Sequence, residues 1–360
     1  MCMGVIIHAI CVVLCCSVLL TLLYSTLLYS TLLYSTLLFG SLIYNGFAVE
    51  GAKYLADVLA TNYSLVTLNF QYNAIGDEGC SLLAESLRYN TSLTSLNLSN
   101  NSIGPRGARS LADMLRFNYT IQVLILQFND FGDQGARLLA EVLAADSGCL
   151  HELDLAGNGL GEQGFTDLAE ALVLNRSLLF LGCSYNTPSE TGVCRIGAML
   201  RHNVTLRGLD LHDCGVNDAG AAALGRGLCH NATLTGLSLD HNNIGDSGLA
   251  ELAEGLRLKV TVLVELDLRE NRFEDAGIAA LADALRFNSS LQRLYGVHLM
   301  PLVRTGMFRL SDAEIRSCEM QFPVGAEDNA LLLETLRGKR EFARLRHELN
   351  KEVVWGDECS

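Results

Sequence analysis

Proline is scarce in this 360-residue chain, and acidic side chains outnumber basic ones. With only four prolines and 49% hydrophobic residues, the chain can bury one long continuous core rather than several globular ones. The 26 Lys and Arg against 40 Asp and Glu give a net charge of −14. Because an acidic surface repels phosphates, this composition argues against nucleic acid and favours a basic protein partner.

Formal charge is missing altogether from residues 1–49, and residues 3–36 are apolar for longer than the roughly 20 residues of a bilayer span. A signal peptide would have Lys or Arg before its apolar stretch, and none precedes this one. Residues 21–35 are three copies of TLLYS, which is typical of low complexity. We predict a membrane anchor at residues 1–36. The alternatives are a cap or low-complexity extension on an otherwise cytoplasmic chain, and a cleaved signal.

What the chain has in abundance is a repeat. Nine times an Asn, or Cys214 in its place, is followed six residues later by Gly, and successive copies lie 28 or 29 residues apart. Residues 93–120 read LTSLNLSNNSIGPRGARSLADMLRFNYT, and the shared frame is LxxLxLxxNxIGxxGxxxLAxxLxxN. A fixed period of this size means that each unit buries its apolar face only against copies of itself.

Each unit is predicted to consist of a strand, a turn and a helix. Leu93, Leu96 and Leu98 alternate as in a strand with one buried side, whereas Leu111 and Leu115 have helical spacing. Since strands stack about 4.8 Å apart and helices are about 10 Å wide, a row of such units must bend with its strands inside.

The turn of each unit holds three kinds of residue with predicted structural roles. The Asn, as at Asn101, makes hydrogen bonds with backbone groups that the strand leaves unpaired, and Ile103 fills the core below the turn as its plug. The Gly lets the helix start lie close against the strand layer. Neighbouring acids accept N–H groups of helix N-termini. These acids are Asp77, Glu78, Asp133, Glu162 and Asp246.

The frame resembles the leucine-rich repeat of the ribonuclease-inhibitor type, which is also found in NOD-like receptors and in the Ran GTPase-activating protein. The resemblance covers residues 37–294 and implies an α/β horseshoe, with an inner parallel sheet and outer helices, that grips another protein without chemistry of its own in most members. We therefore predict three segments: the apolar segment 1–36, the solenoid 37–297, and a C-terminal cap and helical tail at 298–360.

Motifs for chemistry are weak, and no cofactor is expected. The chain has no GxxxxGK[ST], HExxH or GxSxG. Gly159, Gly161 and Gly164 spell GxGxxG, but the last two are frame residues, and a solenoid has no crevice where the strand order reverses.

Two further groups of residues could carry chemistry. His212 and Asp213 lie beside Asp240 and His241 of the next unit, an arrangement that suits a metal ion; cross-strand hydrogen bonds on a solvated face are favoured instead, so no metal is predicted. GTPase activation needs an Arg projected from a loop. Only Arg106 and Arg272 lie in strand-to-helix turns, which are too short to extend, so the family's catalytic Arg is transferred to neither.

The binding face follows from the frame, because its second, third, fifth, seventh and eighth positions point into the concavity. This face is aromatic and neutral toward the N-terminal half and acidic toward the C-terminal half, which suits one basic protein segment lying along it. The alternative is that the rings merely cover neighbouring strands. The predicted binding residues are Tyr44, Gln71, Tyr72, Gln127, Phe128, Phe180, Tyr185, Asp210, His212, Asp213, Asp240, His241, Asp267 and Glu270.

The sequence therefore predicts a non-enzymatic scaffold that binds a protein partner on its concave face, with a regulator of a small GTPase as the alternative. A receptor ectodomain is a third interpretation, permitted by several NxS/T sequons. The sequons are weak evidence for secretion, because they arise from the end of the frame. Cys80, Cys183 and Cys214 occupy frame positions as small buried residues rather than disulfide partners.

Overall fold

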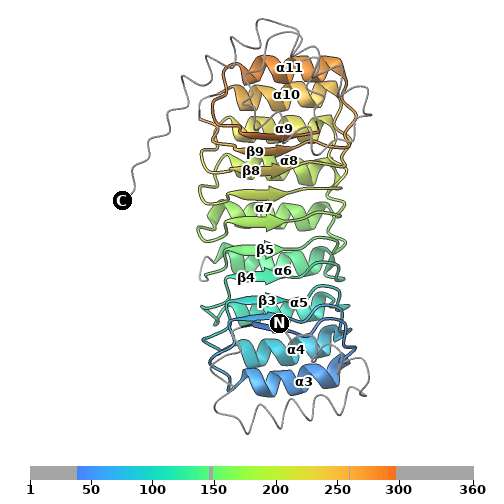
Figure 1. Ribbon diagram of the computed structural model, residues 1–360, viewed down its shortest axis with the longest axis vertical. Helices are drawn as coiled ribbons and strands as arrows, with labels where there is room; N and C mark the ends of the chain where they lie inside the picture. Colours follow the sequence, from blue (N-terminus) through green and yellow to red (C-terminus); the bar gives the residue numbers. More distant parts are fainter. Residues whose placement is uncertain (1–38, 146–148, 259, 297–360) are drawn as a thin grey trace, which may run out of the picture.

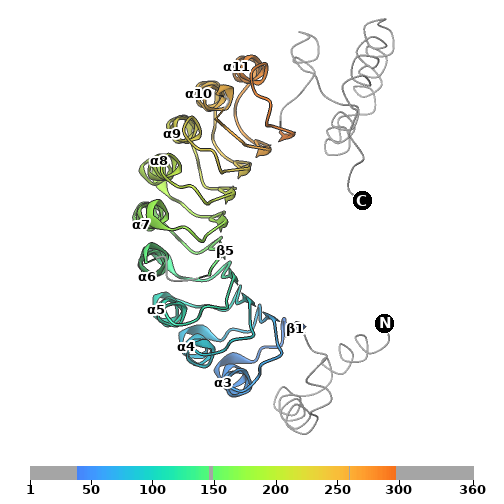
Figure 2. The ribbon, with the colours of Figure 1, turned by 90° about the vertical axis from the view of Figure 1, so that its left-hand side faces the viewer.

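A computed structural model describes residues 39–145, 149–258 and 260–296, which form one curved solenoid (Figure 1). In the side view the strands line the concave side and the helices the convex side (Figure 2). The strands are β1 (Phe39–Ser41), β2 (Thr67–Asn69), β3 (Ser95–Asn97), β4 (Val123–Ile125), β5 (Glu152–Asp154), β6 (Phe180–Gly182), β7 (Gly208–Asp210), β8 (Gly236–Ser238), β9 (Glu265–Asp267) and β10 (Arg293–Tyr295). The helices are α3 (Ala48–Leu59), α4 (Gly76–Leu87), α5 (Pro105–Leu115), α6 (Gly132–Ala144), α7 (Glu162–Leu174), α8 (Ser189–Leu200), α9 (Asp218–Leu228), α10 (Asp246–Arg257) and α11 (Asp275–Leu285).

The ten described strands form a single parallel sheet in sequence order, so no connection crosses another. Each strand residue pairs with the residue one repeat further on, for example Leu68 with Leu96. The step is 29 residues between β4 and β5 and between β8 and β9, as in the pair Leu124 and Leu153. The predicted α/β horseshoe with an inner sheet and outer helices is thereby confirmed.

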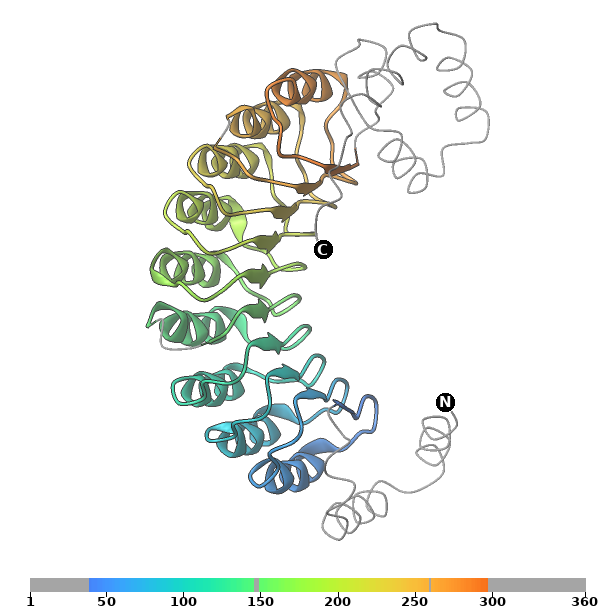
Figure 3. The same cartoon turned by 60° about the vertical axis from the view of Figure 1, so that its left-hand side comes forward.

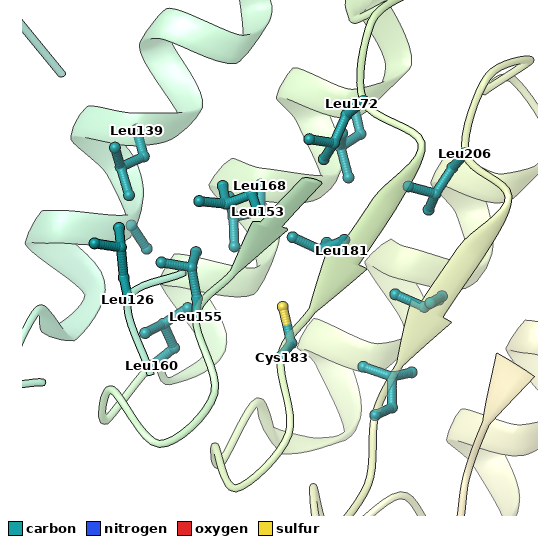
Figure 4. Close-up of a cluster of buried hydrophobic side chains, with 14 of the residues drawn as sticks. Leu126, Leu139, Leu153, Leu155, Leu160, Leu168, Leu172, Leu181, Cys183 and Leu206 are labelled. Atoms are coloured by element: carbon teal, nitrogen blue, oxygen red, sulfur yellow. The ribbon is translucent and has the colours of Figure 1, made fainter. Parts of the chain in front are cut away.

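The core is one continuous layer of leucines between the sheet and the helices. Leu153 and Leu155 of β5 and its turn, Leu160 of the same unit and Leu168 of α7 are all fully buried. In Figure 4 these side chains and those of neighbouring units point into the space between the strands and the helices. Burying one such leucine contributes about 1.5–3 kcal/mol. No unit could retain this layer without its neighbours.

A ladder of asparagines ties the units together where the strands end. Asn101 Nδ2 donates to the carbonyl oxygens of Phe70 and Leu98 at 2.9 and 3.0 Å, and its Oδ1 accepts the N–H of Asn73 at 3.0 Å. Asn101 and Asn73 are fully buried. The predicted role of the Asn is confirmed, and its bonds also cross from one unit to the next.

One rung of this ladder is different. In a regular rung a second N–H also binds the Asn: Ile103, two residues after Asn101, donates its N–H to Asn129 Oδ1 at 3.0 Å. In the unit of β7, Cys214 replaces the Asn and offers no such oxygen. One of the two residues that would donate to that oxygen is Pro188, which has no N–H. Cys214 Sγ donates instead to the carbonyl oxygen of Cys183 at 3.2 Å. The other usual donor, the N–H of Asn186, is directed at the Cys214 sulfur.

Asp77, Asp133 and Asp246 each cap a helix, but that of the next unit rather than their own. Glu162 accepts the Ser189 hydroxyl instead, and within the described residues no helix N–H bonds to Glu78. Asp77 lies in α4, yet its Oδ1 accepts the N–H groups of Gly104 and Gly107 at the start of α5, both at 2.7 Å. The expected reason for the Gly needs correction. A Cβ on Gly107 would lie 2.3 Å from Ile103 and 2.9 Å from the Asp77 carboxylate, so the Gly makes room for the plug and the cap rather than for the strand layer.

The prediction of a transmembrane helix is corrected by the structure. Within the described ranges, no helix is long and apolar enough to cross a membrane. The longest of them, α6 and α7, have 13 residues each, or about 20 Å of helix against a hydrocarbon core of about 30 Å. Residues 1–36, where the anchor was predicted, and the cap and tail at 298–360 lie outside the described residues.

Helices α8, α9 and α10 approach one another more closely than side chains would allow. A Cβ on Gly227 or Gly255 would lie 2.4 Å from the carbonyl oxygen of Gly197 or Gly225, respectively. The Gly197 and Gly225 frame position is Ala in the other helices, for example Ala112 and Ala140. Backbone packs against backbone here, on the convex side of the C-terminal half.

The cysteines behave as predicted for small buried residues. Cys80, Cys183 and Cys214 are buried, and the six cysteines of the described residues are all free thiols. Burial raises the pKa of Cys214 to about 12, so this thiol stays protonated and donates its hydrogen bond at physiological pH.

Candidate partner-binding face

The eighth frame position has one backbone conformation in every described unit. The turns that follow the strands line up along one edge of the sheet (Figure 3). There φ is positive, from 47° at Asp213 to 61° at Gly157, and for Tyr72 it is 58°. A left-handed conformation costs a bulky residue about 1–2 kcal/mol. Bonds between units hold it, as when Phe128 N–H donates to Ala156 O at 2.7 Å.

Aromatic side chains at this edge form what we call the aromatic strip: Tyr44, Tyr72, Phe128, Tyr185, His212 and His241. The rings of Tyr44 and Tyr72 stack with centroids 4.0 Å apart. Phe128 and Tyr185 are 5.7 Å apart, and Tyr185 and His212 are 4.7 Å apart. Tyr44, Phe128 and Tyr185 are 70%, 45% and 49% exposed, so their faces are open to a ligand.

A glycine makes the longer part of the strip continuous. Gly157 occupies the eighth position between Phe128 and Tyr185, and a Cβ there would lie 2.5 Å from the Phe128 ring. The ring thus lies over Gly157 and reaches the next unit. Asn100 at the same position separates Tyr72 from Phe128. The strip is therefore a stacked pair followed by a run that ends at His241.

Two carboxylates of the acidic half already have side-chain partners. Asp240 Oδ2 lies 2.8 Å from His212 Nδ1, and Asp267 pairs with Arg269 at 2.5 Å. Asp213 and Glu270 are left with no ion-pair partner among the residues that the structure describes. Both stand at the eighth position, in the same row as the rings.

Glu152 and Asp154 belong to this face, although the sequence did not single them out. Burial is the main reason that the pKa of Asp154 is raised, and the charge of Asp210 adds to it, while the N–H of Ala156 and the Gln127 amide act the other way. Burial and Asp154 likewise raise the pKa of Glu152. Negative charge is therefore concentrated across β5 to β7.

Three of the predicted residues make contacts that limit their freedom. Gln127 Nε2 donates to Asp154 Oδ2 at 2.6 Å. Asp210 Oδ2 accepts the hydroxyl of Ser184 at 2.6 Å. The Phe180 ring lies over Gly208, where a Cβ would be 2.6 Å from it. These side chains are held in place and form the floor of the face rather than free anchors.

Three of the four residues considered from the sequence, His212, Asp240 and His241, come together, with their ligand atoms all within 4.8 Å of one another, whereas Asp213 is not part of the cluster. The contacts are those of a hydrogen-bonded cluster. Asp240 Oδ1 also accepts the Ser238 hydroxyl at 2.6 Å, and Arg269 Nη2 lies 3.9 Å from Asp240 Oδ2. The nearby guanidinium supplies the positive charge that this carboxylate needs, and it opposes a cation at the same place.

Two of the three glycines of the GxGxxG motif have no free N–H for a phosphate. The N–H groups of Gly161 and Gly164 both donate to Asp133 Oδ1, at 2.6 and 2.9 Å. This is the cap between units that Asp77 makes two units earlier. Arg106, predicted in a strand-to-helix turn, is an exposed residue in the first turn of α5 itself, whereas Arg272 is exposed in the short turn before α11.

Comparison with known proteins agrees with the repeat. A family model described as "Leucine Rich repeat" matches residues 61–84, 89–112, 117–140, 202–225, 230–253 and 261–282. Each match begins just after one helix ends and covers the strand that follows and most of the next helix. The chain is a leucine-rich repeat protein. The α-helix in every described unit fits the ribonuclease-inhibitor type of repeat.

Three solved structures resemble this leucine-rich repeat protein. Leiomodin-1 actin-binding site 2 is 22% identical, with a TM-score of 0.29 over 41% of this chain and 80% of that one. The Caenorhabditis elegans tropomodulin C-terminal domain is 21% identical, with a TM-score of 0.36 over 43% and 92%. TLR13 in complex with ssRNA13 is 20% identical, with a TM-score of 0.42 over 71% and 32%. These similarities do not bear on the partner of this chain. No curated protein matches it.

A second group of exposed rings lies at the opposite edge of the solenoid, where the helices end. It consists of Tyr63, Tyr89, Phe117 and Tyr119, and Arg88 stacks over Phe117 with its guanidinium 3.8 Å from the ring centroid. Sequence reasoning missed these residues. The available signal was their position, because each is next to the last Asn of the frame.

Proposed function

We propose that this leucine-rich repeat protein is a non-enzymatic scaffold whose concave face binds an extended protein segment containing basic side chains. Members of the family typically act through protein binding rather than catalysis. The aromatic strip supplies amphipathic anchors of the kind that dominate binding energy. The acids farther along the same row supply charge complementarity.

One observation carries the proposal: rings and unpaired carboxylates occupy one row with one backbone conformation. A segment following that row meets Phe128 and Tyr185 first and then Asp213 and Glu270. Arginine suits both, since a guanidinium stacks on aromatic faces and pairs with carboxylates. The positive φ of bulky side chains in this row also supports a binding role, because strained backbone clusters at ligand sites.

A peptide array tests the proposal with the full chain. Wild-type protein is incubated with arrayed Lys- and Arg-rich peptides and with matched peptides in which Asp and Glu replace the basic residues. We expect capture of the basic set only, and we expect Tyr72→Ala, Phe128→Ala and Tyr185→Ala together to abolish it while the melting temperature is retained. Crosslinking mass spectrometry in cells then identifies the natural partner.

The matched control removes three rings at the other edge, with Tyr63→Ala, Tyr89→Ala and Tyr119→Ala. These side chains are 73%, 75% and 64% exposed, so the loss of apolar surface is comparable. Capture should survive in this control. Equal loss in both triple variants, or capture that ignores peptide charge, would contradict the assignment of the concave face.

GTPase activation remains the alternative function and has its own assay. No described turn is longer than its counterparts around Arg106 or Arg272, so neither residue reaches out as an arginine finger would. Nucleotide hydrolysis by candidate small GTPases should be unchanged by the chain. Acceleration that is lost in Arg106→Ala or Arg272→Ala would favour the alternative.

A further inference from the structure

A second ladder of asparagines runs along the edge where the helices end. We call its members the end-of-frame asparagines, and each begins an NxS/T sequon: Asn62, Asn90, Asn118, Asn175, Asn203, Asn231 and Asn288. Six of them are at most 8% exposed, and Asn288 is partly buried. These positions have the sequence of N-glycosylation sites but not the exposure.

From Asn90 onward, the amide of each end-of-frame asparagine joins two units. Asn118 Nδ2 donates to the carbonyl oxygens of Leu87 and Asn90 at 2.7 and 3.1 Å, so both of its hydrogens are used. Its Oδ1 accepts the N–H groups of Thr120 and Ile121, both at 2.9 Å. Buried amides that lose such partners are costly.

The same bonds recur along the ladder. Asn90 Nδ2 donates to the carbonyl oxygens of Leu59 and Asn62, each at 3.0 Å. Asn231 Nδ2 donates to those of Leu200 and Asn203 at 2.8 and 3.2 Å. The clamp is therefore a property of the repeat and not of one unit.

The hydroxyl of the sequon also has a structural use. Thr120 Oγ1 donates to the carbonyl oxygen of Asn90 at 3.1 Å, and Ser92 Oγ donates to that of Asn62 at 3.3 Å. The fold alone thus accounts for Asn followed two residues later by Ser or Thr. No selection for a glycan is needed to explain seven sequons in register.

We propose that N-glycosylation of the end-of-frame asparagines and folding of the solenoid are mutually exclusive. In the transfer, Nδ2 forms a bond to C1 of the sugar, the bond from C1 to the pyrophosphate of a lipid-linked oligosaccharide breaks, and Nδ2 loses one proton. That proton is one of the two that bind the preceding unit. The buried Nδ2 has no room for a sugar, so a glycosylated asparagine cannot return to its place.

Two consequences follow for the life of the protein. The folded chain is not a substrate, because exposing a buried rung requires separation of neighbouring units. A nascent chain that meets oligosaccharyltransferase is diverted from folding at whichever rung is modified first. The solenoid therefore has to fold where that enzyme does not reach it.

Two other sequons provide an internal control. They begin at Asn97 and Asn100 on the concave side of β3 and its turn, outside the ladder. Asn100 is partly exposed, and its side chain makes no hydrogen bond within the described part of the chain. A glycan on Asn100 points into the concavity and breaks no clamp, so it should be compatible with the fold.

The test directs the full chain to the endoplasmic reticulum behind an added signal peptide. A base variant removes all nine of these sequons by changing their Ser or Thr to Ala, at residues 64, 92, 99, 102, 120, 177, 205, 233 and 290. Every Asn is kept. At two of the altered frame positions other units already lack the hydroxyl, with Cys149 in the place of Thr120 and Ala156 in the place of Ser99. Thr120 alone or Ser102 alone is then restored, and glycosylation and resistance to limited proteolysis are measured with and without tunicamycin.

We expect the base variant to be unglycosylated and protease-resistant, as proof that it folds. With Thr120 restored, glycosylated molecules should be digested at least about tenfold faster than unglycosylated ones, because the clamp at Asn118 is open in every one of them. Tunicamycin should restore resistance. With Ser102 restored, glycosylated and unglycosylated molecules should be equally resistant. Molecules that carry a glycan on Asn118 and are still as resistant as the Ser102 form would overturn the proposal.

Discussion

The two halves of the solenoid share one repeat frame but differ on both the concave and the convex face. Up to β6 the eighth frame position carries Tyr44, Tyr72, Phe128 and Tyr185, whereas after β7 it carries Asp213, His241 and Glu270, and the helices α8, α9 and α10 touch through glycines. The strand register continues unchanged across the boundary, and the asparagine ladder runs on both sides of it, with Cys214 in place of one rung. The comparison teaches that the frame specifies the stacking, while the positions outside it are free to build different surfaces.

The largest effect is expected where helices meet backbone to backbone. Gly225→Leu should destabilise the chain by about 3 kcal/mol or more, because even a Cβ would lie 2.5 Å from the carbonyl oxygen of Glu251. Arg226→Leu adds a similar side chain to the exposed side of α9 and should have little effect. Urea unfolding measures both. A mild cost at Gly225 would mean that the C-terminal half packs no more closely than the N-terminal half.

The shared frame predicts equal costs in the two halves. Asn129→Ala and Asn242→Ala each remove a buried amide that donates to two or more carbonyls, so each should cost about 2–3 kcal/mol. The two values, from chemical denaturation, should agree within about 1 kcal/mol. A large difference would show that the ladder does not support the halves equally.

Charge reversal in the acidic half sharpens the difference between the concave faces. Asp213→Lys with Glu270→Lys should weaken binding of Arg-rich peptides by about tenfold and flatten its dependence on salt, because two attractive charges become repulsive. Asp113→Lys on the exposed side of α5 is the control. Titration at two salt concentrations by fluorescence anisotropy would show the change, and unaltered affinity would argue against the acidic row.

The smallest expected effect concerns pH. The pKa of Asp154 is raised in the fold, so the ionised form is penalised: the penalty is absent below the unfolded pKa, develops as pH rises, and is complete above the folded pKa. Asp154→Asn should therefore raise the melting temperature at pH 7 by about 2 °C, and the gain should vanish in acid below the unfolded pKa. A gain that is equal at all pH values would indicate a packing effect.

Much of the fold was predictable because the same signal occurs nine times. The strand, the helix, Asn101 and the plug at Ile103 all follow from local spacing, and repetition removes the ambiguity of any single unit. The partner of Asp77 was not predictable in the same way. Its carboxylate is close to its own helix in sequence but binds the next one, and only the stacking distance between units decides between them.

The candidate site likewise has features that the sequence predicts and features that only the structure reveals. Tyr72, Phe128 and Tyr185 were found because they share a frame position. The left-handed backbone there was missed, since Tyr, Asn, Phe, Asp, His and Glu have no chemistry in common at that position. Asp154 was missed because the causes of its raised pKa, burial and the charge of Asp210 two units away, depend on how the units stack and leave no local signal in the sequence. The binding role of the whole face stays a prediction.

The left-handed row offers a way to separate function from folding. Glycine relieves the steric cost at any of these positions, so Phe128→Gly or Tyr185→Gly should leave the chain as stable as before or more so. The same replacements delete the rings. A variant that keeps its melting temperature but no longer binds its ligand cannot be dismissed as misfolded. Replacing each residue of this row with glycine in turn would therefore show which side chains bind the ligand, without a loss of stability to confuse the result.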